Sequence, residues 1–217
     1  MATKVVKALD VAELQSILQK QNATWKAGPN PIMQLPREER LKRLGANPPG
    51  GRQALKAREQ QGKANVKMGG HAAKAVGFPA AYDWRNVGGN NFVTPIRDQG
   101  GCGSCVAFGS TATVEGMVQI SRNDPNTGVD LSEAHLFFCC GPATGASCNN
   151  GWWPDNALDC YKNPGVSDEA CFPYVAMDQA CTACADWQSR VTLISGWHQI
   201  TSTDDMKTWL SSNGPLN

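Results

Sequence analysis

The stretch Gln99-Gly100-Gly101-Cys102-Gly103-Ser104-Cys105-Val106-Ala107-Phe108 guides the interpretation of the whole sequence. Its three glycines and one serine place two cysteines just before an apolar run with helical spacing, so we predict that Cys105 lies in the first turn of a helix. A helix N-terminus carries partial positive charge and unpaired N–H groups, and both favour the thiolate that attacks carbonyl carbons. Gln99 lies upstream and has a side-chain amide that can donate to an oxyanion. Cys105 and Gln99 are therefore candidate catalytic residues.

A Cys-x-x-Cys pair has other uses. Cys102 and Cys105 could form a redox couple, half of a zinc site or part of a disulfide framework. Cys181 and Cys184 form a second pair, but it lies much farther from the first than the roughly 15–20 residues of a zinc ribbon. We therefore predict no metal site.

The stretch resembles the active-site signature of papain-like cysteine proteases, Gln-Gly-x-Cys-Gly-Ser-Cys-Trp-Ala-Phe. Val106 departs from it, because the family usually has Trp at that position. The resemblance implies that Cys105 is the nucleophile, Gln99 an oxyanion-hole residue and Cys102 a disulfide partner. It also implies hydrolysis of bonds in peptide or protein substrates, without a cofactor.

Two later segments extend the resemblance. Leu131-Ser132-Glu133 resembles the family's Leu-Ser-Glu-Gln helix, with Ser132 as the predicted cap of a helix over residues 133–138. Cys148-Asn149-Asn150-Gly151 resembles Cys-Asn-Gly-Gly, which implies that Gly151 offers its backbone to substrate like an added strand. Asn150 replaces the first glycine of that motif, and Asn tolerates a positive φ.

Trp152 and Trp153 follow Gly151 directly. By resemblance they lie near the wall of the pocket for the second residue upstream of the cleaved bond. An apolar or aromatic side chain would suit that pocket. The alternative is that one or both simply pack in the core.

All nine cysteines lie between Cys102 and Cys184, and an odd number fits four disulfides plus one free nucleophile. The resemblance implies that Cys102 pairs with Cys148 and that Cys139 reaches the Cys181–Cys184 cluster. The remaining cysteines are assigned to further cross-links: Cys140, Cys160 and Cys171.

Cysteine content predicts an extracellular or other oxidising compartment. Residues 1–7 lack the apolar stretch of a signal peptide, so we expect the signal to lie outside this sequence. No apolar run approaches the roughly 18 residues of a membrane span, and we predict no membrane partner.

The net charge of +1 hides a split between two parts of the chain. Residues 1–76 carry 14 Lys and Arg against 5 Asp and Glu, whereas residues 77–217 carry 6 against 14. A basic arm often binds nucleic acid, but here it precedes an acidic body of nearly opposite charge. We predict docking of the arm on the body rather than nucleic-acid binding. A solvated tail is the alternative.

Residues 1–76 are predicted to hold helices at about 10–27 and 36–44, followed by an extended linker over 45–76. Residues 22–30 and 41–45 resemble the short pro-region of cathepsin B-like members of the family. The resemblance implies that residues 1–76 are an inhibitory propeptide that crosses the cleft in the direction opposite to substrate. Protonation of the acidic body below about pH 4–5 should weaken its docking.

The resemblance implies an α+β fold of the papain-like two-domain type. Residues 77–190 would form a nearly complete left, helical domain, with a helix beginning at Pro154. Residues 191–217 would only begin the right, β-barrel domain, with a strand over 190–200 and a last helix opening at 203–205.

The family's general base lies roughly 130–150 residues beyond the nucleophile, which is past Asn217. None of His71, His135 and His198 fits that role. We therefore expect a zymogen fragment, inactive alone, whose catalytic His and Asn come from a complementary C-terminal chain. The alternative is a non-catalytic pseudoprotease or a disulfide-rich binding module.

Overall fold

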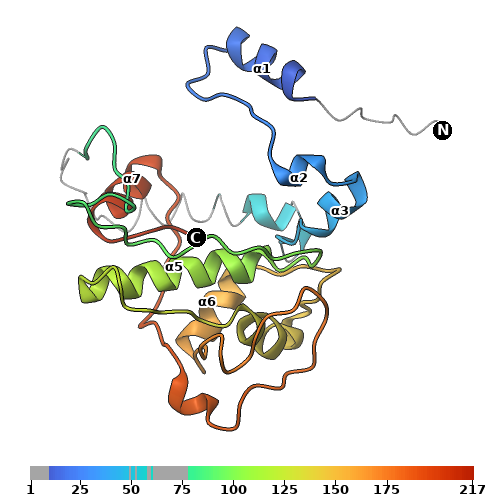
Figure 1. The fold of residues 1–217 in the computed structure, drawn as a ribbon, viewed down its shortest axis with the longest axis vertical. Coiled ribbons are helices and arrows are strands. Elements are labelled where there is room, and N and C mark those ends of the chain that lie inside the picture. The colour runs from blue at the N-terminus through green and yellow to red at the C-terminus, as the bar shows by residue number, and fades with distance from the viewer. Residues whose placement is uncertain (1–9, 49, 52, 58–59, 61–77) are drawn as a thin grey trace. The chain divides into compact units, whose positions relative to one another are not determined.

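The computed structural model describes residues 10–48, 50–51, 53–57, 60 and 78–217 (Figure 1). The chain divides into two units, Met1–Leu41 and Lys42–Asn217. The boundary between the units lies at residue 41 rather than at residue 76. Residues 43–47 belong to the second unit, because they hydrogen-bond to Gln99 and Trp152. His71 and most of the predicted linker lie outside the described residues.

Short capped helices make up the described part of the first unit. Helix α1 (Val11–Lys20) begins with the expected capping box between Asp10 and Glu13. It ends at Lys20, so the predicted extension to residue 27 is wrong. Asn22 adopts a left-handed φ of 51° and the N–H of Ala23 returns to the carbonyl of Leu18, which closes the helix.

Two further helices follow in chain order. Helix α2 (Pro31–Gln34) was not predicted; Asn30 caps it by accepting from the N–H of Met33. Helix α3 (Arg37–Lys42) matches the prediction for residues 36–44 to within two residues at its end. Residues 53–57 are also helical, so the prediction of a fully extended linker is wrong there.

The core of the second unit lies around helix α5 (Cys105–Arg122), which packs against α6 (Pro154–Lys162) (Figure 1). The α6 helix also contacts a π-helical segment, η1 (His135–Cys140). Inside this core the hydroxyl groups of Tyr161 and Thr111 are hydrogen-bonded at 2.9 Å. Val106 is 5% exposed and packs in the same core.

Ser132 caps the turn before η1 as the sequence predicts. Its hydroxyl oxygen accepts from the N–H of His135 at 2.8 Å and its proton goes to the carbonyl of Phe172 at 2.6 Å. The bond to Phe172 joins this turn to a loop distant in the sequence.

Three short elements complete the second unit: η2 (Pro142–Thr144), η3 (Trp187–Arg190) and α7 (Thr203–Ser212). Helix α7 begins where the sequence predicts, and Ser202 caps it through the N–H of Asp205. No described helix combines the length and apolar character that a membrane crossing requires.

The strand predicted over residues 190–200 is wrong. Thr192 forms only an isolated antiparallel bridge with Val166, and the described residues contain bridges but no longer strand. Alternation alone cannot make a strand, because its N–H and C=O groups need a partner along their length. The regular secondary structure of the described residues is therefore helical, and they lack the β component of the predicted α+β fold.

Four disulfides cross-link the second unit. Cys102 is joined to Cys148 and Cys139 to Cys181, the pairings that the resemblance implies. Cys140 pairs with Cys160, and Cys171 with Cys184. Cys102, Cys181 and Cys184 are thus unavailable as metal ligands, which argues against the zinc alternative, and Cys105 alone is free.

A buried carboxyl group lies at the edge of this core. Glu133 is 6% exposed, and its pKa is raised to about 8, chiefly by burial and also by the nearby Glu169 and Glu115, against the lowering effect of a backbone hydrogen bond and of Arg97. Burial also raises the pKa of Glu115, although its oxygens accept from the hydroxyl of Thr94 and the N–H of Leu131.

We predict that the second unit loses stability as the pH rises from about 4.5, the ordinary pKa of glutamate, to about 8. In that window the folded state holds a proton on Glu133 that the unfolded state has released. The free energy of unfolding should therefore fall by up to about 1.4 kcal/mol per pH unit. Urea unfolding at a series of pH values should show a flatter slope for Glu133→Gln than for the wild type.

The exposed Glu38→Gln serves as the control, and it should retain the wild-type slope. An identical pH dependence in the wild type and Glu133→Gln would show that Glu133 is not the responsible group.

Candidate active site

Cys105 is the first residue of helix α5 and its side chain is half-buried. Ser104 occupies the N-cap position, yet its side chain makes no capping hydrogen bond. Ser104 therefore takes none of the first N–H groups of the helix, and the positive end of the helix dipole lies at Cys105. This arrangement suits a thiolate or a developing oxyanion.

Gln99 lies on the loop that leads to Cys105. Its side-chain amide donates to the carbonyl of Cys102 at 2.7 Å and to the carbonyl of Arg43 at 3.1 Å. The first bond folds the loop back on itself and fixes the amide. The second shows that this amide can reach a carbonyl oxygen supplied from elsewhere.

Residues 43–47 form a segment that crosses this site. The N–H of Trp152 donates to the carbonyl of Gly45 at 2.7 Å, and the N–H of Asn47 donates to the carbonyl of Trp152 at 3.1 Å. These two bonds make a parallel bridge between Ala46 and Trp152. Segment 43–47 therefore pairs with the backbone that follows Gly151.

Three glycines let these backbones approach closely. A Cβ on Gly45 would lie 1.8 Å from the carbonyl oxygen of Gly103, and a Cβ on Gly151 would lie 1.9 Å from that of Gly45. Gly151 also has a φ of 67°, which glycine adopts without strain. Substitution at either Gly45 or Gly151 would force segment 43–47 outward.

Segment 43–47 is also held by charge. The guanidinium of Arg43 forms an ion pair with the carboxylate of Asp98, next to Gln99. The hydrogen bond from Arg43, together with the N–H of Gly100, lowers the pKa of Asp98 below its ordinary value. Asp98 is 72% exposed, so water and salt screen this pair.

The remaining predicted site residues take different positions. Trp152 contributes its backbone to the site, but its side chain is 4% exposed, packs edge-on against Phe137 and donates to the hydroxyl of Thr144 at 2.8 Å. Its ring is therefore part of the core, which was the alternative reading of the sequence. Trp153 is half-buried at the N-cap of α6.

Asn150 does not adopt the positive φ that the glycine motif suggested. Gly151 takes the left-handed conformation, whereas the described non-glycine residues with positive φ are Asn22 and Asn123. Asn150 contributes its backbone carbonyl, which accepts a hydrogen bond from the side-chain amide of Asn47.

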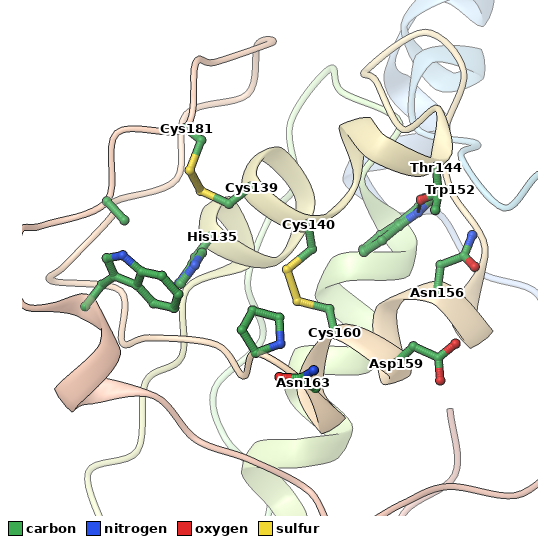
Figure 2. Close-up of a pocket in the computed structure, with 13 residues that line it drawn as sticks. His135, Cys139, Cys140, Thr144, Trp152, Asn156, Asp159, Cys160, Asn163 and Cys181 are labelled. Atoms are coloured by element: carbon green, nitrogen blue, oxygen red, sulfur yellow. Dashed lines mark hydrogen bonds between the residues drawn. A yellow bond between two sulfur atoms is a disulfide. The ribbon is translucent and has the colours of Figure 1, made fainter.

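A cavity of about 490 Å³ lies elsewhere in the second unit (Figure 2). Figure 2 shows that its walls include the disulfides Cys139–Cys181 and Cys140–Cys160. His135 and Trp152 line it, but Cys105 does not. The cavity is thus distinct from the site at the start of α5.

Neither described histidine takes the role of a base for Cys105. His135 is buried and accepts the N–H of Ser167 on Nδ1 at 3.0 Å, and burial lowers its pKa. His198 is exposed and lies edge-on against Trp209 at 4.8 Å. Both side chains are explained by these local contacts.

Sequence reasoning missed three residues that contact the site: Arg43, Asp98 and Tyr174. Tyr174 donates to the backbone carbonyl of Gln99 at 2.8 Å. The opposite charges of residues 1–76 and 77–217 indicated that ion pairs such as Arg43–Asp98 could form between them. No local sequence pattern indicates a role for Tyr174.

Comparisons with known proteins identify the family of the chain. Residues 78–217 match the family described as papain family cysteine protease. Cysteine proteinase 1 of Entamoeba histolytica is 40% identical over 103 residues, which are 48% of this chain and 31% of that protein. A cathepsin L-like proteinase of Fasciola hepatica is 34% identical over 129 residues, or 59% of this chain and 37% of that protein. The chain thus spans about a third of the length of these curated relatives.

The fold is also found among solved structures. Digestive procathepsin L2 from the larval midgut of Tenebrio molitor aligns with a TM-score of 0.69 at 24% identity, covering 94% of this chain and 62% of that one. The proform of the ragweed pollen allergen Amb a 11, a cysteine protease, aligns with a TM-score of 0.53. These likenesses show a papain-like fold. With the match of residues 78–217, they establish that this chain belongs to the papain family of cysteine proteases.

Proposed function

We propose that the protein is a papain-like cysteine endopeptidase in which Cys105 is the nucleophile. One observation carries the proposal: the single cysteine outside a disulfide is also the first residue of α5, and the loop that leads to it holds the Gln99 amide against the carbonyl of Cys102. A structural cysteine has no need of a free thiol, an uncapped helix end and a neighbouring amide donor in one place.

In the proposed reaction the Cys105 thiolate attacks the carbonyl carbon of the peptide bond, and the C=O electron pair moves to oxygen. The Gln99 side chain and the N–H of Cys105 stabilise that oxyanion. The C–N bond then breaks as the amine leaves with a proton from an imidazolium, and water hydrolyses the thioester. The imidazole and the Asn that orients it are proposed to come from outside residues 1–217.

Substrate would bind where segment 43–47 now lies. Gly151 offers close backbone approach, Asn150 and Trp152 offer backbone groups, and Trp153 is the proposed aromatic wall for an apolar side chain of substrate. The ring of Trp152 is buried against Phe137 and is not part of that proposed wall.

Residues 1–76 are proposed to be the propeptide of a zymogen, with the short cathepsin B-like form that the sequence resembles. Segment 43–47 supports this role, because it occupies the Gln99 amide and pairs in parallel with Trp152. In the resembled family substrate runs the other way. The disulfides and the cathepsin L-like relatives point to an oxidising, secretory compartment, and we propose export from the cell.

The test is mutation of the complete enzyme. Cys105→Ser should abolish peptide hydrolysis, and Gln99→Ala should lower kcat by roughly 10²–10³-fold because one oxyanion donor is lost. Rates with a fluorogenic peptide amide give both values. Cys102→Ser is the control for the second cysteine of the motif, because its thiol is structural and its loss should lower stability first.

The rival function is a pseudoprotease or a disulfide-rich binding module. A peptidyl epoxide should label Cys105 of the complete, matured enzyme far faster than it labels a free thiol. Labelling at the rate of a free thiol, together with no peptide hydrolysis, would favour the binding module.

We predict that Gly45→Ala weakens inhibition by the propeptide. The added methyl group meets the backbone of Gly103, which cannot move aside as a flexible side chain would. The rate of Cys105 alkylation in the proenzyme should rise at least several-fold. Gly28→Ala is the matched control, since nothing lies within 4 Å of its added Cβ. Equal alkylation rates for Gly45→Ala and Gly28→Ala would contradict the role of segment 43–47.

We also predict that Asp98→Asn makes propeptide release faster at neutral pH and less dependent on pH. Because Arg43 lowers the pKa of Asp98, the pair stabilises docking above the ordinary carboxylate pKa and is lost as the pH falls through the lowered value. The time course of maturation at pH 3–7, with and without salt, measures this. The rate of propeptide release should change only a few-fold, because exposed ion pairs contribute little.

Asp83→Asn controls for loss of a carboxylate, because Asp83 pairs locally with Arg85. If Asp98→Asn matured with the wild-type pH profile, the Arg43–Asp98 pair would have no part in docking.

A further inference from the structure

We propose that Tyr174 is a positioning residue for the oxyanion side of the active site. This inference deepens the proposed function and rests on it. Tyr174 does not contact the reacting atoms. It acts through Gln99 and Ser104, the two ends of the loop that carries the nucleophile.

The phenol of Tyr174 hydrogen-bonds to both ends of the loop over residues 99–104. Its hydroxyl donates to the backbone carbonyl of Gln99 at 2.8 Å and lies 2.7 Å from the hydroxyl of Ser104. Since its own proton goes to Gln99, the phenol oxygen accepts from Ser104. One hydroxyl thus bonds to both Ser104 and Gln99, which lie 70 and 75 positions before Tyr174 in the chain.

The bond to Ser104 accompanies the missing side-chain cap of α5, where Ser104 has a ψ of 15° rather than the extended backbone of a capping serine. Serine at an N-cap normally accepts from the N–H of the second or third helical residue. Ser104 is fully buried and its hydroxyl is directed to Tyr174 instead. Ser104 therefore takes neither of the N–H groups, of Val106 and Ala107, that a capping serine would engage.

The second bond, from the Tyr174 hydroxyl to the backbone carbonyl of Gln99, holds the main chain of Gln99 in place. The Gln99 side chain is already tied to the carbonyl of Cys102 at 2.7 Å. With its carbonyl held by Tyr174, Gln99 has restraints at both ends. A donor fixed in advance stabilises an oxyanion more than one that must reorganise.

The Tyr174 ring has rigid support. It packs edge-on against Phe108 of α5 at 4.8 Å and stacks with Phe138 at 6.1 Å. Its backbone N–H donates to the carboxylate of Glu169 at 2.7 Å. The hydroxyl is consequently held at a defined position relative to α5.

The experiment uses Tyr174→Phe in the complete enzyme, because phenylalanine keeps the ring contacts and removes only the hydroxyl. We expect kcat to fall roughly tenfold with KM unchanged, as for loss of one positioned hydrogen bond. The Ki of a peptide aldehyde, whose carbonyl becomes an oxyanion when Cys105 adds to it, should rise by the same factor. The rate of iodoacetamide alkylation, which forms no oxyanion, should stay within about twofold.

Two further variants separate positioning from folding. Tyr161→Phe removes a tyrosine hydroxyl that is more deeply buried and is bonded to Thr111 of α5, and it should leave kcat and aldehyde binding unchanged. In a Gln99→Ala background, Tyr174→Phe should lower kcat less than in the wild type, because part of its effect passes through Gln99. If Tyr174→Phe folds poorly, Ser104→Ala removes the other bond and should shift kcat and aldehyde Ki in the same direction.

Three results would overturn the inference: an unchanged kcat in Tyr174→Phe, an equal loss in Tyr161→Phe, or alkylation falling in proportion to kcat. An inactive wild type whose Cys105 reacts like a free thiol would instead refute the proposed function on which the inference depends.

Discussion

The uncapped N-terminus of α5 is the feature on which the rest of the second unit depends. The helix dipole favours negative charge at Cys105, and Ser104 takes none of the first N–H groups, which in most helices find a side-chain partner. Ser104 bonds to Tyr174 instead of to the helix, and the Gln99 side chain folds back onto the carbonyl of Cys102. The first turn of α5 therefore lacks a side-chain cap, while hydrogen bonds hold the loop that leads into it.

The neighbouring disulfide and glycines give that open end its shape. Cys102–Cys148 fastens the loop before α5 to the loop before Gly151. Because Gly45, Gly103 and Gly151 lack side chains, a third stretch of backbone fits between these loops. Two main-chain hydrogen bonds join segment 43–47 to Trp152, and their geometry depends on how closely the backbones approach. The side-chain amides of Gln99 and Asn47 add two further bonds. The Arg43–Asp98 pair adds a screened electrostatic contribution at the rim.

Local sequence patterns predicted much of the helical framework. The starts of α1, α5, α6 and α7 follow from caps, an N-terminal proline and helical spacing, which act within a few residues. The predictions for the end of α1 and for a strand over residues 190–200 were wrong for different reasons. Asn22 closes α1 through a left-handed turn that residue type only permits, and a strand requires a partner that alternation cannot supply.

The sequence by itself predicted Cys105 as the candidate nucleophile and Gln99 as its amide donor, because these predictions depend on residue type and short spacing. It also predicted one unpaired cysteine, which the structure confirms as Cys105. Only the tertiary structure decided that Trp152 gives its ring to the core and its backbone to the site. It also decided that Arg43, Asp98 and Tyr174 converge on the Gln99 loop. These contacts join residues tens of positions apart, and no local propensity encodes which distant groups the folded chain brings together.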